Sequence, residues 1–167
     1  MSKSKSESIK IGDVLPNATL AELCAGQEPQ MHQVSELAKG KKIAFFMVPG
    51  AFTPACTNNH LPGFLEQVAA FEAKGVDEIW CVAVNDMFVM EAWGRDRQVD
   101  GKIRMLADGS AEWTKQLGVE LDLTDKGLGV RSHRLSAYVE NGVVKQLNID
   151  AGGALKISDA QTLLNQI

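Results

Sequence analysis

The chain has 167 residues, a net charge of −4 and a hydrophobic content of 45%, which is typical of one globular domain spanning residues 1–167. It has no cluster of Lys and Arg and no run of about 18 apolar residues, so we expect neither nucleic acid nor a membrane among its partners. The N-terminal lysines are not followed by the apolar segment of a secretory signal. The chain contains three cysteines, an odd number, which does not indicate a framework of disulfides. We therefore expect a cytoplasmic protein with reduced thiols.

The first half of the chain contains a β-α-β pattern. Residues 1–8 are polar and predict a disordered tail, and residues 11–23 predict a loop followed by an edge strand. The runs 43–48 (IAFFMV) and 79–84 (IWCVAV) are apolar throughout, which is typical of strands buried on both faces of a parallel sheet. Apolar residues recur at helical spacing over 61–71, so we expect a helix between these two strands.

The second half predicts a hairpin and a closing helix. In the segment 134–149, Asn141-Gly142 separates two β-rich runs, which indicates a type I′ turn. The other expected elements are helices over 87–97 and 110–117, a strand over 103–107, and a helix over 158–167 capped by Ser158 or Asp159. A β-α-β unit, then a hairpin, then a helix is the chain order of the thioredoxin fold. We therefore expect an α/β protein with a central mixed sheet flanked by helices.

The stretch 48–64, VPGAFTPACTNNHLPGF, places a cysteine at the start of a predicted helix. Thr53 is a good N-cap residue and Pro54 suits the first helical position, so Cys56 falls in the first turn. Unpaired backbone N–H groups and the helix dipole stabilise a thiolate there, which makes a reactive nucleophile. The Thr53 hydroxyl could also donate to the sulfur or to a bound oxygen.

Pro62 lies inside the same helical pattern. It cannot donate a hydrogen bond to the carbonyl of Asn58, and its ring crowds that carbonyl, so we expect a kink or a π-bulge. We hypothesise that the first turn, partly uncoupled in this way, can fray and expose an oxidised Cys56.

The residues alone leave other interpretations open. A free cysteine often packs as a small hydrophobic side chain, so Cys56 could be inert. Cys56 and His60 could share a helix face, but two ligands do not make a zinc site, and we expect no metal and no cofactor.

The stretch closely resembles the active-site loop of peroxiredoxins, in particular the type II (fifth-subfamily, atypical) group. The resemblance includes the pattern Pro-x-x-x-Thr-x-x-Cys and continues in VNDMFVMEAW, LADGSAEWTKQLG, KGLGVRSHR and ENGVVKQLNI, so it covers nearly the whole chain after residue 9. It implies a thioredoxin-fold, thiol-dependent peroxidase that reduces hydrogen peroxide and organic hydroperoxides.

The resemblance also implies roles for single residues. Cys56 matches the peroxidatic cysteine, which attacks the peroxide and becomes a sulfenic acid. Thr53 matches the threonine that hydrogen-bonds the peroxide and the sulfur, and Pro49 matches the proline that shields the pocket. Gly50 and Phe52 fall in the loop that holds the substrate.

The family also uses an arginine to stabilise the thiolate and the charge that grows on the leaving oxygen. Arg131 and Arg134 are both candidates, and the alignment with the family favours Arg134, with Arg131 as a helper or a surface charge. His60 matches a family histidine and is either a modulator or a packing residue.

The remaining cysteines bear on how the sulfenic acid is reduced. Many atypical members carry a resolving cysteine near the C-terminus, whereas residues 148–167 contain none. Cys81 matches a cysteine of plant members and is expected in the core, with a redox role as the alternative; Cys24 has no family role. We therefore expect an external reductant. Glutathione with glutaredoxin is the preferred candidate, and thioredoxin is the second candidate.

The resemblance further implies a homodimer, because type II members often dimerise through the loops around the active site. Two other functions stay open at this point. A thiol–disulfide oxidoreductase is disfavoured because Cys56 has no CxxC partner. A non-enzymatic peroxide or redox sensor would differ by its slow peroxide turnover.

Overall fold

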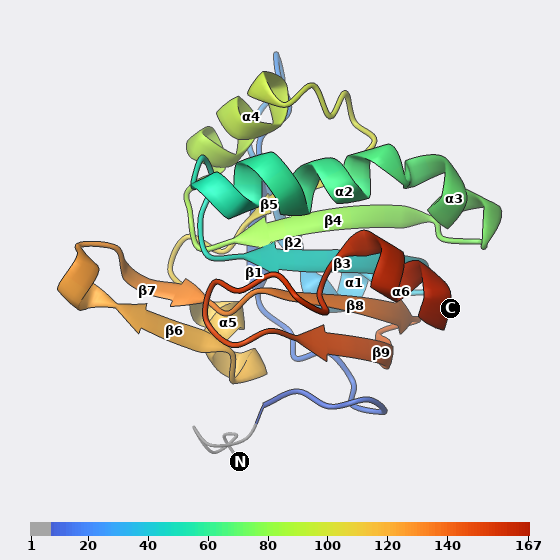
Figure 1. Cartoon of the computed structure of the whole chain (residues 1–167). Coiled ribbons are helices and arrows are strands. Elements are labelled where there is room, and N and C mark those ends of the chain that lie inside the picture. Colours follow the sequence, from blue (N-terminus) through green and yellow to red (C-terminus); the bar gives the residue numbers. More distant parts are fainter. Residues whose placement is uncertain (1–7) are drawn as a thin grey trace.

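The computed structural model describes residues 8–167 and contains one large sheet with helices on both faces (Figure 1). The predicted disordered tail lies outside the described residues, except for Ser8. The large sheet has the strand order β2-β1-β5-β4-β3-β8-β9. Its strands are β1 (Thr19–Glu22), β2 (Gln30–Gln33), β3 (Lys42–Val48), β4 (Glu78–Ala83), β5 (Arg104–Ala107), β8 (Leu135–Glu140) and β9 (Val143–Ile149).

The remaining elements are helices and one small ribbon. The ribbon pairs β6 (Glu120–Leu123) with β7 (Gly129–Ser132). The helices are α1 (Val34–Leu37), the π-helix η1 (Cys56–His60), α2 (Leu61–Glu66), α3 (Val68–Ala73), α4 (Met87–Asp96), α5 (Glu112–Leu117), the short 3₁₀ turn η2 (Thr124–Lys126) and α6 (Ala160–Gln166). Within residues 8–167, no helix has the length and apolar character needed to cross a bilayer.

The sheet is mixed, as predicted. Strand β3 pairs parallel to β4 on one side and antiparallel to β8 on the other, and β4 pairs parallel to β5. The predicted strands 43–48 and 79–84 correspond to β3 and β4 within one residue at each end. The predicted hairpin is β8–β9, and its turn residues Asn141 and Gly142 have φ angles of 48° and 80°, as a type I′ turn requires.

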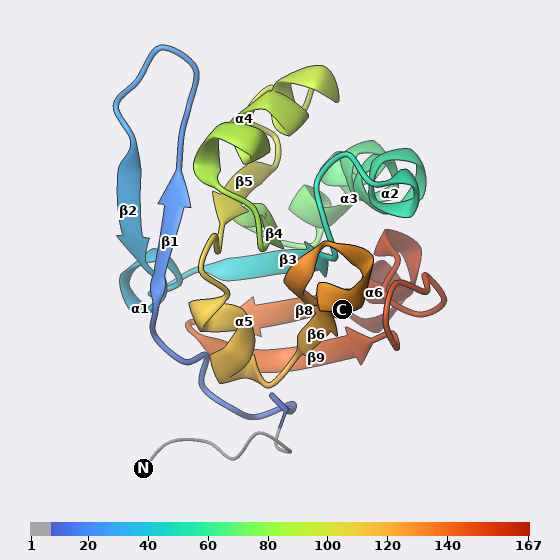
Figure 2. The same cartoon turned by 90° about the vertical axis from the view of Figure 1, so that its left-hand side faces the viewer.

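Two apolar layers enclose the sheet because successive residues of a strand face opposite sides. Phe46 of β3 stacks on Phe64 of α2 with 4.2 Å between ring centroids, in the layer that contains α2, α3, α4 and α6. Its neighbour Phe45 contacts Trp113 of α5 at 5.5 Å, in the layer that contains α1 and α5. Figure 2 shows the two groups of helices on opposite sides of the sheet.

One prediction about the N-terminal region is wrong. Strand β1 is not at the edge of the sheet, because β2 pairs with its outer side. The sequence of β2, Gln-Met-His-Gln, is almost entirely polar and shows no alternating apolar pattern, so it gave no strand signal. The strand forms through its pairing with β1 rather than through its own burial.

Candidate active site

The turn that carries Cys56 has the predicted start. The helical conformation begins at Pro54, directly after Thr53, and the Thr57 N–H donates to the Thr53 carbonyl at 2.9 Å. Cys56 then opens the π-helix η1, in which the Leu61 N–H donates to the Cys56 carbonyl five residues back. The expected π-bulge is therefore confirmed, and its cause is the missing N–H of Pro62.

Cys56 and Arg134 are in direct contact. Cys56 is completely buried, and the Nη2 atom of Arg134 donates a hydrogen bond to its Sγ atom at 3.1 Å. Arg134 precedes β8 and is only 2% exposed. Its Nη1 atom donates to Nδ1 of His60 at 3.0 Å, and its Nε atom donates to the carbonyl of Gly153 at 3.1 Å. The guanidinium thus holds three side-chain hydrogen bonds at once.

None of the ion pairs formed within residues 8–167 includes Arg134. A buried guanidinium without a carboxylate partner is costly, because a buried charge needs a counter-charge or strong hydrogen bonds. The sulfur of Cys56 becomes such a counter-charge when it is deprotonated. The arrangement therefore places a buried positive charge directly against the sulfur, and the thiolate is the nucleophilic form of a cysteine.

Arg131 lies at the side of the site instead. It is partly exposed, and its Nη1 atom donates to the carbonyl of Pro49 at 3.2 Å while Nε donates to the carbonyl of Leu128 at 2.9 Å. A Cβ atom on Gly50 would lie 2.7 Å from Nη1 of Arg131, so the close approach of this arginine depends on glycine at that position. Arg131 supports the loop, whereas Arg134 reaches the sulfur.

The loop 49–53 is held by short contacts from several elements. Its Ala51 N–H donates to Oδ1 of Asn85 at 2.9 Å, and the Thr53 hydroxyl donates to the Gly50 carbonyl at 2.7 Å rather than to the sulfur. Phe52 has a φ angle of 65° and is 51% exposed. A left-handed conformation costs a bulky residue roughly 1–2 kcal/mol, and such strain is most common at functional sites.

His60 is buried against the other side of Arg134. Its Nε2 atom lies 2.8 Å from the carbonyl of Ser158, which can only accept, so Nε2 carries the proton and Nδ1 accepts from Arg134. Burial and the adjacent positive charge of Arg134 lower the pKa of His60 to about 3. The imidazole is therefore neutral at physiological pH.

Sequence reasoning missed two supports of the site. Asn85 follows the carboxyl end of β4, where functional side chains gather in parallel sheets, and that position was a usable signal. The loop 150–158 contributes the carbonyls of Gly153 and Ser158. Backbone carbonyls leave no trace in a sequence pattern, so this contribution had no comparable signal.

The three cysteines occupy different environments and are all free thiols. Cys81 lies on β4, fully buried, in the same apolar layer as Cys56. Burial raises the pKa of the Cys81 thiol well above its ordinary value, and a negative charge on Cys56 raises it further. Cys24 is exposed. Neither residue therefore matches the environment of Cys56.

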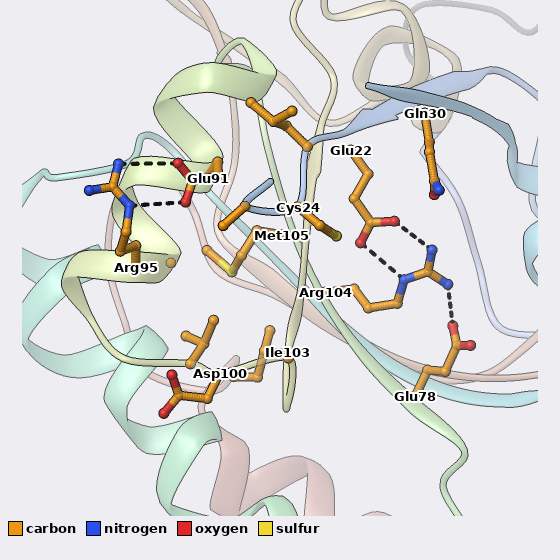
Figure 3. Close-up of a pocket in the computed structure, with 15 residues that line it drawn as sticks. Glu22, Cys24, Gln30, Glu78, Glu91, Arg95, Asp100, Ile103, Arg104 and Met105 are labelled. Carbon is orange, nitrogen blue, oxygen red and sulfur yellow. Dashed lines mark hydrogen bonds and ion pairs between the residues drawn. The ribbon is translucent and has the colours of Figure 1, made fainter. Parts of the chain in front are cut away.

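A cavity of about 650 Å³ lies apart from Cys56, between β1, β5 and α4, and Cys24 is among its lining residues (Figure 3). Five of its charged groups are paired with each other: Arg104 binds Glu22 at 2.6 Å and Glu78 at 3.0 Å, and Arg95 binds Glu91 at 3.1 Å. Glu78 lies at the start of β4, whereas Asn85, which binds the loop 49–53, follows the end of the same strand. The length of the strand separates these two residues by roughly 20 Å. This cavity is not part of the site around Cys56.

No group of three or more His, Cys, Asp or Glu side chains within residues 8–167 is arranged to hold a metal ion. The groups gathered around Cys56 are the guanidinium of Arg134, the neutral imidazole of His60 and the loop 49–53.

Comparison with known proteins gives a consistent result. The Redoxin family model matches residues 10–164. Peroxiredoxin-2B from Arabidopsis thaliana is 45% identical over 159 residues, which cover 95% of this chain and 98% of that protein. The solved structure of reduced Prx3 from Vibrio vulnificus in complex with H2O2 is 46% identical, with a TM-score of 0.89 over 94% of this chain and 98% of that one. Peroxiredoxin 5 from Alvinella pompejana is 32% identical, with a TM-score of 0.84 over 95% and 97%. The chain therefore belongs to the redoxin family and, within it, to the type II (fifth-subfamily) peroxiredoxins.

Proposed function

We propose that the protein is a thiol-dependent peroxidase that reduces hydrogen peroxide and organic hydroperoxides, with Cys56 as the nucleophile. The observation that carries this proposal is the hydrogen bond of 3.1 Å from Nη2 of Arg134 to Sγ of Cys56. A buried positive charge at this distance favours the thiolate. The related Prx3 was solved in complex with H2O2, which supports hydrogen peroxide as a substrate.

In the proposed reaction, the thiolate of Cys56 gives an electron pair to one peroxide oxygen. The S–O bond forms as the O–O bond breaks, so the cysteine becomes a sulfenic acid and the peroxide is reduced. The departing oxygen leaves as hydroxide or alkoxide and takes up a proton to become water or an alcohol. Arg134 stabilises the negative charge both before the reaction, on sulfur, and during it, on the departing oxygen.

The loop 49–53 supplies the rest of the proposed site. Rotation about one side-chain bond turns the Thr53 hydroxyl from the carbonyl of Gly50 toward a bound peroxide. Pro49 covers the pocket, and Phe52 forms its exposed rim. His60 acts as a neutral partner of Arg134, because a second positive charge here would be repelled.

An external thiol regenerates the proposed enzyme. The sulfur of a thiol such as glutathione attacks the sulfenic acid, which forms a mixed disulfide and releases water. A second thiol then attacks the mixed disulfide and returns Cys56 to its reduced form. Glutaredoxin is the preferred candidate for this step, and thioredoxin is the alternative. The buried position of Cys81 and the absence of cysteine from residues 148–167 support this assignment.

We further propose that the protein forms a homodimer through the loops around the site. Phe52 is 51% exposed and Phe88, at the start of α4, is 62% exposed. The ring of Phe52 lies 6.4 Å from that of Trp93 of the same helix, so both exposed phenylalanines lie close to α4. The molar mass in solution, measured by light scattering, tests the proposal, and Phe88→Ser should weaken the dimer.

Peroxide consumption under steady-state conditions tests the main proposal. Cys56→Ser should abolish activity, because a serine hydroxyl stays protonated at neutral pH and is a far weaker nucleophile. Cys24→Ser is the matched control and should retain it. Parallel assays with glutathione plus glutaredoxin and with thioredoxin identify the reductant, and an insulin-reduction assay excludes a general disulfide reductase. Peroxidase activity that survives in Cys56→Ser would refute the assignment.

A further inference from the structure

The buried carboxylate of Asp150 has no part in the proposed reaction, yet it organises the loop behind the site. Asp150 follows β9 and is 5% exposed. Its oxygens accept hydrogen bonds from the N–H groups of Lys156 at 2.9 Å, Ile157 at 3.1 Å and Ser158 at 3.0 Å, and from the Ser158 hydroxyl at 2.7 Å. The carboxylate therefore closes the loop 150–158 upon itself, between β9 and α6 (Figure 1).

Asp150 is charged at physiological pH. Burial alone would raise its pKa, but the hydrogen bonds from Ser158, Lys156 and Ile157 outweigh burial and lower the pKa below the ordinary value. A carboxylate that accepts several backbone N–H groups is a strong organiser, because each charge-assisted hydrogen bond is shorter and stronger than a neutral one.

The loop closed by Asp150 holds Arg134 on two sides. Directly, the carbonyl of Gly153 accepts from Nε of Arg134 at 3.1 Å, and the carbonyl of Gly152 accepts from the Arg134 backbone N–H at 3.2 Å. Indirectly, the carbonyl of Ser158 accepts from His60, whose Nδ1 accepts from Nη1 of Arg134. Both routes lead to Arg134, whose remaining side-chain nitrogen, Nη2, contacts the sulfur of Cys56.

We infer that Asp150 is a positioning residue for the reaction at Cys56: it closes the loop 150–158 so that the carbonyls of Gly153 and Ser158 orient Arg134 toward the sulfur. The inference rests on the proposed peroxidase function and assigns part of the catalytic geometry to a residue that touches neither substrate nor thiol. A hydrogen bond weakens steeply as its angle departs from linearity, so a small shift of the two carbonyls changes the contact between Arg134 and Cys56.

The chain offers a matched control in Asp108. Asp108 is also buried, at 2% exposed, and accepts hydrogen bonds from the N–H groups of Trp113 and Thr114 and from the Thr114 hydroxyl, at 3.2, 2.8 and 2.7 Å. It closes the turn before α5, on the opposite face of the sheet from Cys56. Asp150→Asn and Asp108→Asn thus remove the same charge from similar surroundings, but only Asp150 supports Arg134.

The first measurement is the second-order rate constant for H2O2 by stopped flow, alongside the free energy of unfolding. Asp150→Asn should slow the reaction by about ten- to a hundredfold, the effect of misplacing a catalytic group by a fraction of its contact distance. Asp108→Asn should lower stability but leave the rate constant within about twofold of the wild type, because the hydrogen bonds of the Asp108 side chain go to Trp113 and Thr114 and not to Arg134, His60 or the loop 150–158. Equal losses of rate in the two variants would overturn the inference.

The second measurement does not depend on turnover. The ultraviolet absorbance of the thiolate, recorded against pH in a Cys24→Ser background, reports how well Arg134 stabilises Cys56. Asp150→Asn should move the midpoint to higher pH and Asp108→Asn should not. If the wild type does not reduce peroxide, the proposed function fails while this titration still tests the positioning role. A folded Asp150→Asn protein with an unchanged rate and midpoint refutes that role.

A milder variant decides the matter if Asp150→Asn does not fold. Ser158→Ala removes one hydrogen bond to Asp150 but keeps the backbone carbonyl that His60 contacts. It should slow the reaction with H2O2 by roughly two- to tenfold, the loss expected for one hydrogen bond, and move the thiolate midpoint in the same direction. An unchanged rate and midpoint in this variant would overturn the inference.

Discussion

Arg134 and Cys56 are separated by 78 residues in the chain, yet Nη2 of the arginine lies 3.1 Å from Sγ of the cysteine. The other side-chain nitrogens of Arg134 bind the neutral acceptors His60 and Gly153. In the proposed reaction, a thiolate on Cys56 is the negative charge that faces this guanidinium. The proposed chemistry depends on this one pair.

Arg134→Ala should slow the reaction of Cys56 with peroxide by about 30- to 1000-fold. This range corresponds to the loss of roughly 2–4 kcal/mol of transition-state stabilisation from one charged donor. The same change should raise the pH at which Cys56 becomes reactive, because the positive charge that favours the thiolate is gone. Stopped-flow kinetics across a pH series measures both effects.

Arg131→Ala is the matched control for that experiment. The side chain of Arg131 bonds only to the carbonyls of Pro49 and Leu128 in the described part of the chain, so we expect a smaller loss of rate through a looser loop 49–53. If Arg131→Ala proves the more damaging substitution, the roles given to the two arginines must be exchanged.

Cys81 should take no part in turnover. It is fully buried on β4, and a disulfide with Cys56 requires the two Cα atoms to approach within about 7 Å in a suitable orientation. After one equivalent of peroxide, we expect Cys56 as sulfenic acid, or as the glutathione adduct when glutathione is present, with Cys24 and Cys81 free. Intact mass and a non-reducing peptide map measure this. A Cys56–Cys81 disulfide that forms rapidly and is needed for turnover contradicts the one-cysteine mechanism.

His60 should make the folded state lose stability in acid. Its pKa is about 3 in the folded protein and about 6.5 when unfolded, so between these values the unfolded chain binds the extra proton. Stability therefore falls as the pH falls from about 6.5 toward 3, by at most about 1.4 kcal/mol per pH unit from this group. Urea unfolding at several pH values should show a shallower slope for His60→Gln than for the wild type; equal slopes would contradict the neutral, buried imidazole.

Arg104→Met should destabilise the protein without slowing the reaction at Cys56. Burial opposes the ionisation of Glu22, but Arg104 and His32 outweigh it and lower the pKa of Glu22, so the variant leaves a largely buried, charged carboxylate with His32 as its remaining partner. We expect a loss of about 3 kcal/mol, the lower end of the range for buried pairs, because the Arg104 side chain is 23% exposed. Chemical denaturation measures it.

Arg95→Met is the control on the same cavity. The Arg95 side chain is 68% exposed and pairs with Glu91 on a helix surface, so its removal should leave the denaturation midpoint unchanged. A similar loss of stability in Arg104→Met and Arg95→Met would contradict the argument that a buried ion pair contributes more to stability than an exposed one.

The parts of the fold that sequence reasoning predicted are those with a local cause. The apolar run of β3, the Asn141-Gly142 turn and the start of the helix at Pro54 each follow from residues within a few positions of each other. The π-helix also has a local cause, the missing N–H of Pro62. Strand β2 does not, because its polar residues become a strand only through pairing with β1.

The same distinction applies to the site. The position of Cys56 in a first helical turn follows from the sequence, whereas the choice between Arg134 and Arg131 came from the resemblance to a family and not from spacing. The structure places Arg134 at the sulfur. The support from Asp150 was not predicted, because it acts through backbone carbonyls of Gly153 and Ser158 that any residue carries.

The complete burial of Cys56 has a kinetic consequence for regeneration. Hydrogen peroxide is only slightly larger than water, so we expect it to need little displacement of the loop 49–53. We expect glutathione or a protein thiol, which is much larger, to reach the sulfur only when the π-helical turn moves aside. The proposed reduction of the sulfenic acid would then consist of an opening step followed by attack of the thiol. At low thiol concentration the observed rate should rise in proportion to the thiol, and at high concentration it should level off at the opening rate. Reductants of different chemistry should then share one limiting rate, set by the protein rather than by the thiol.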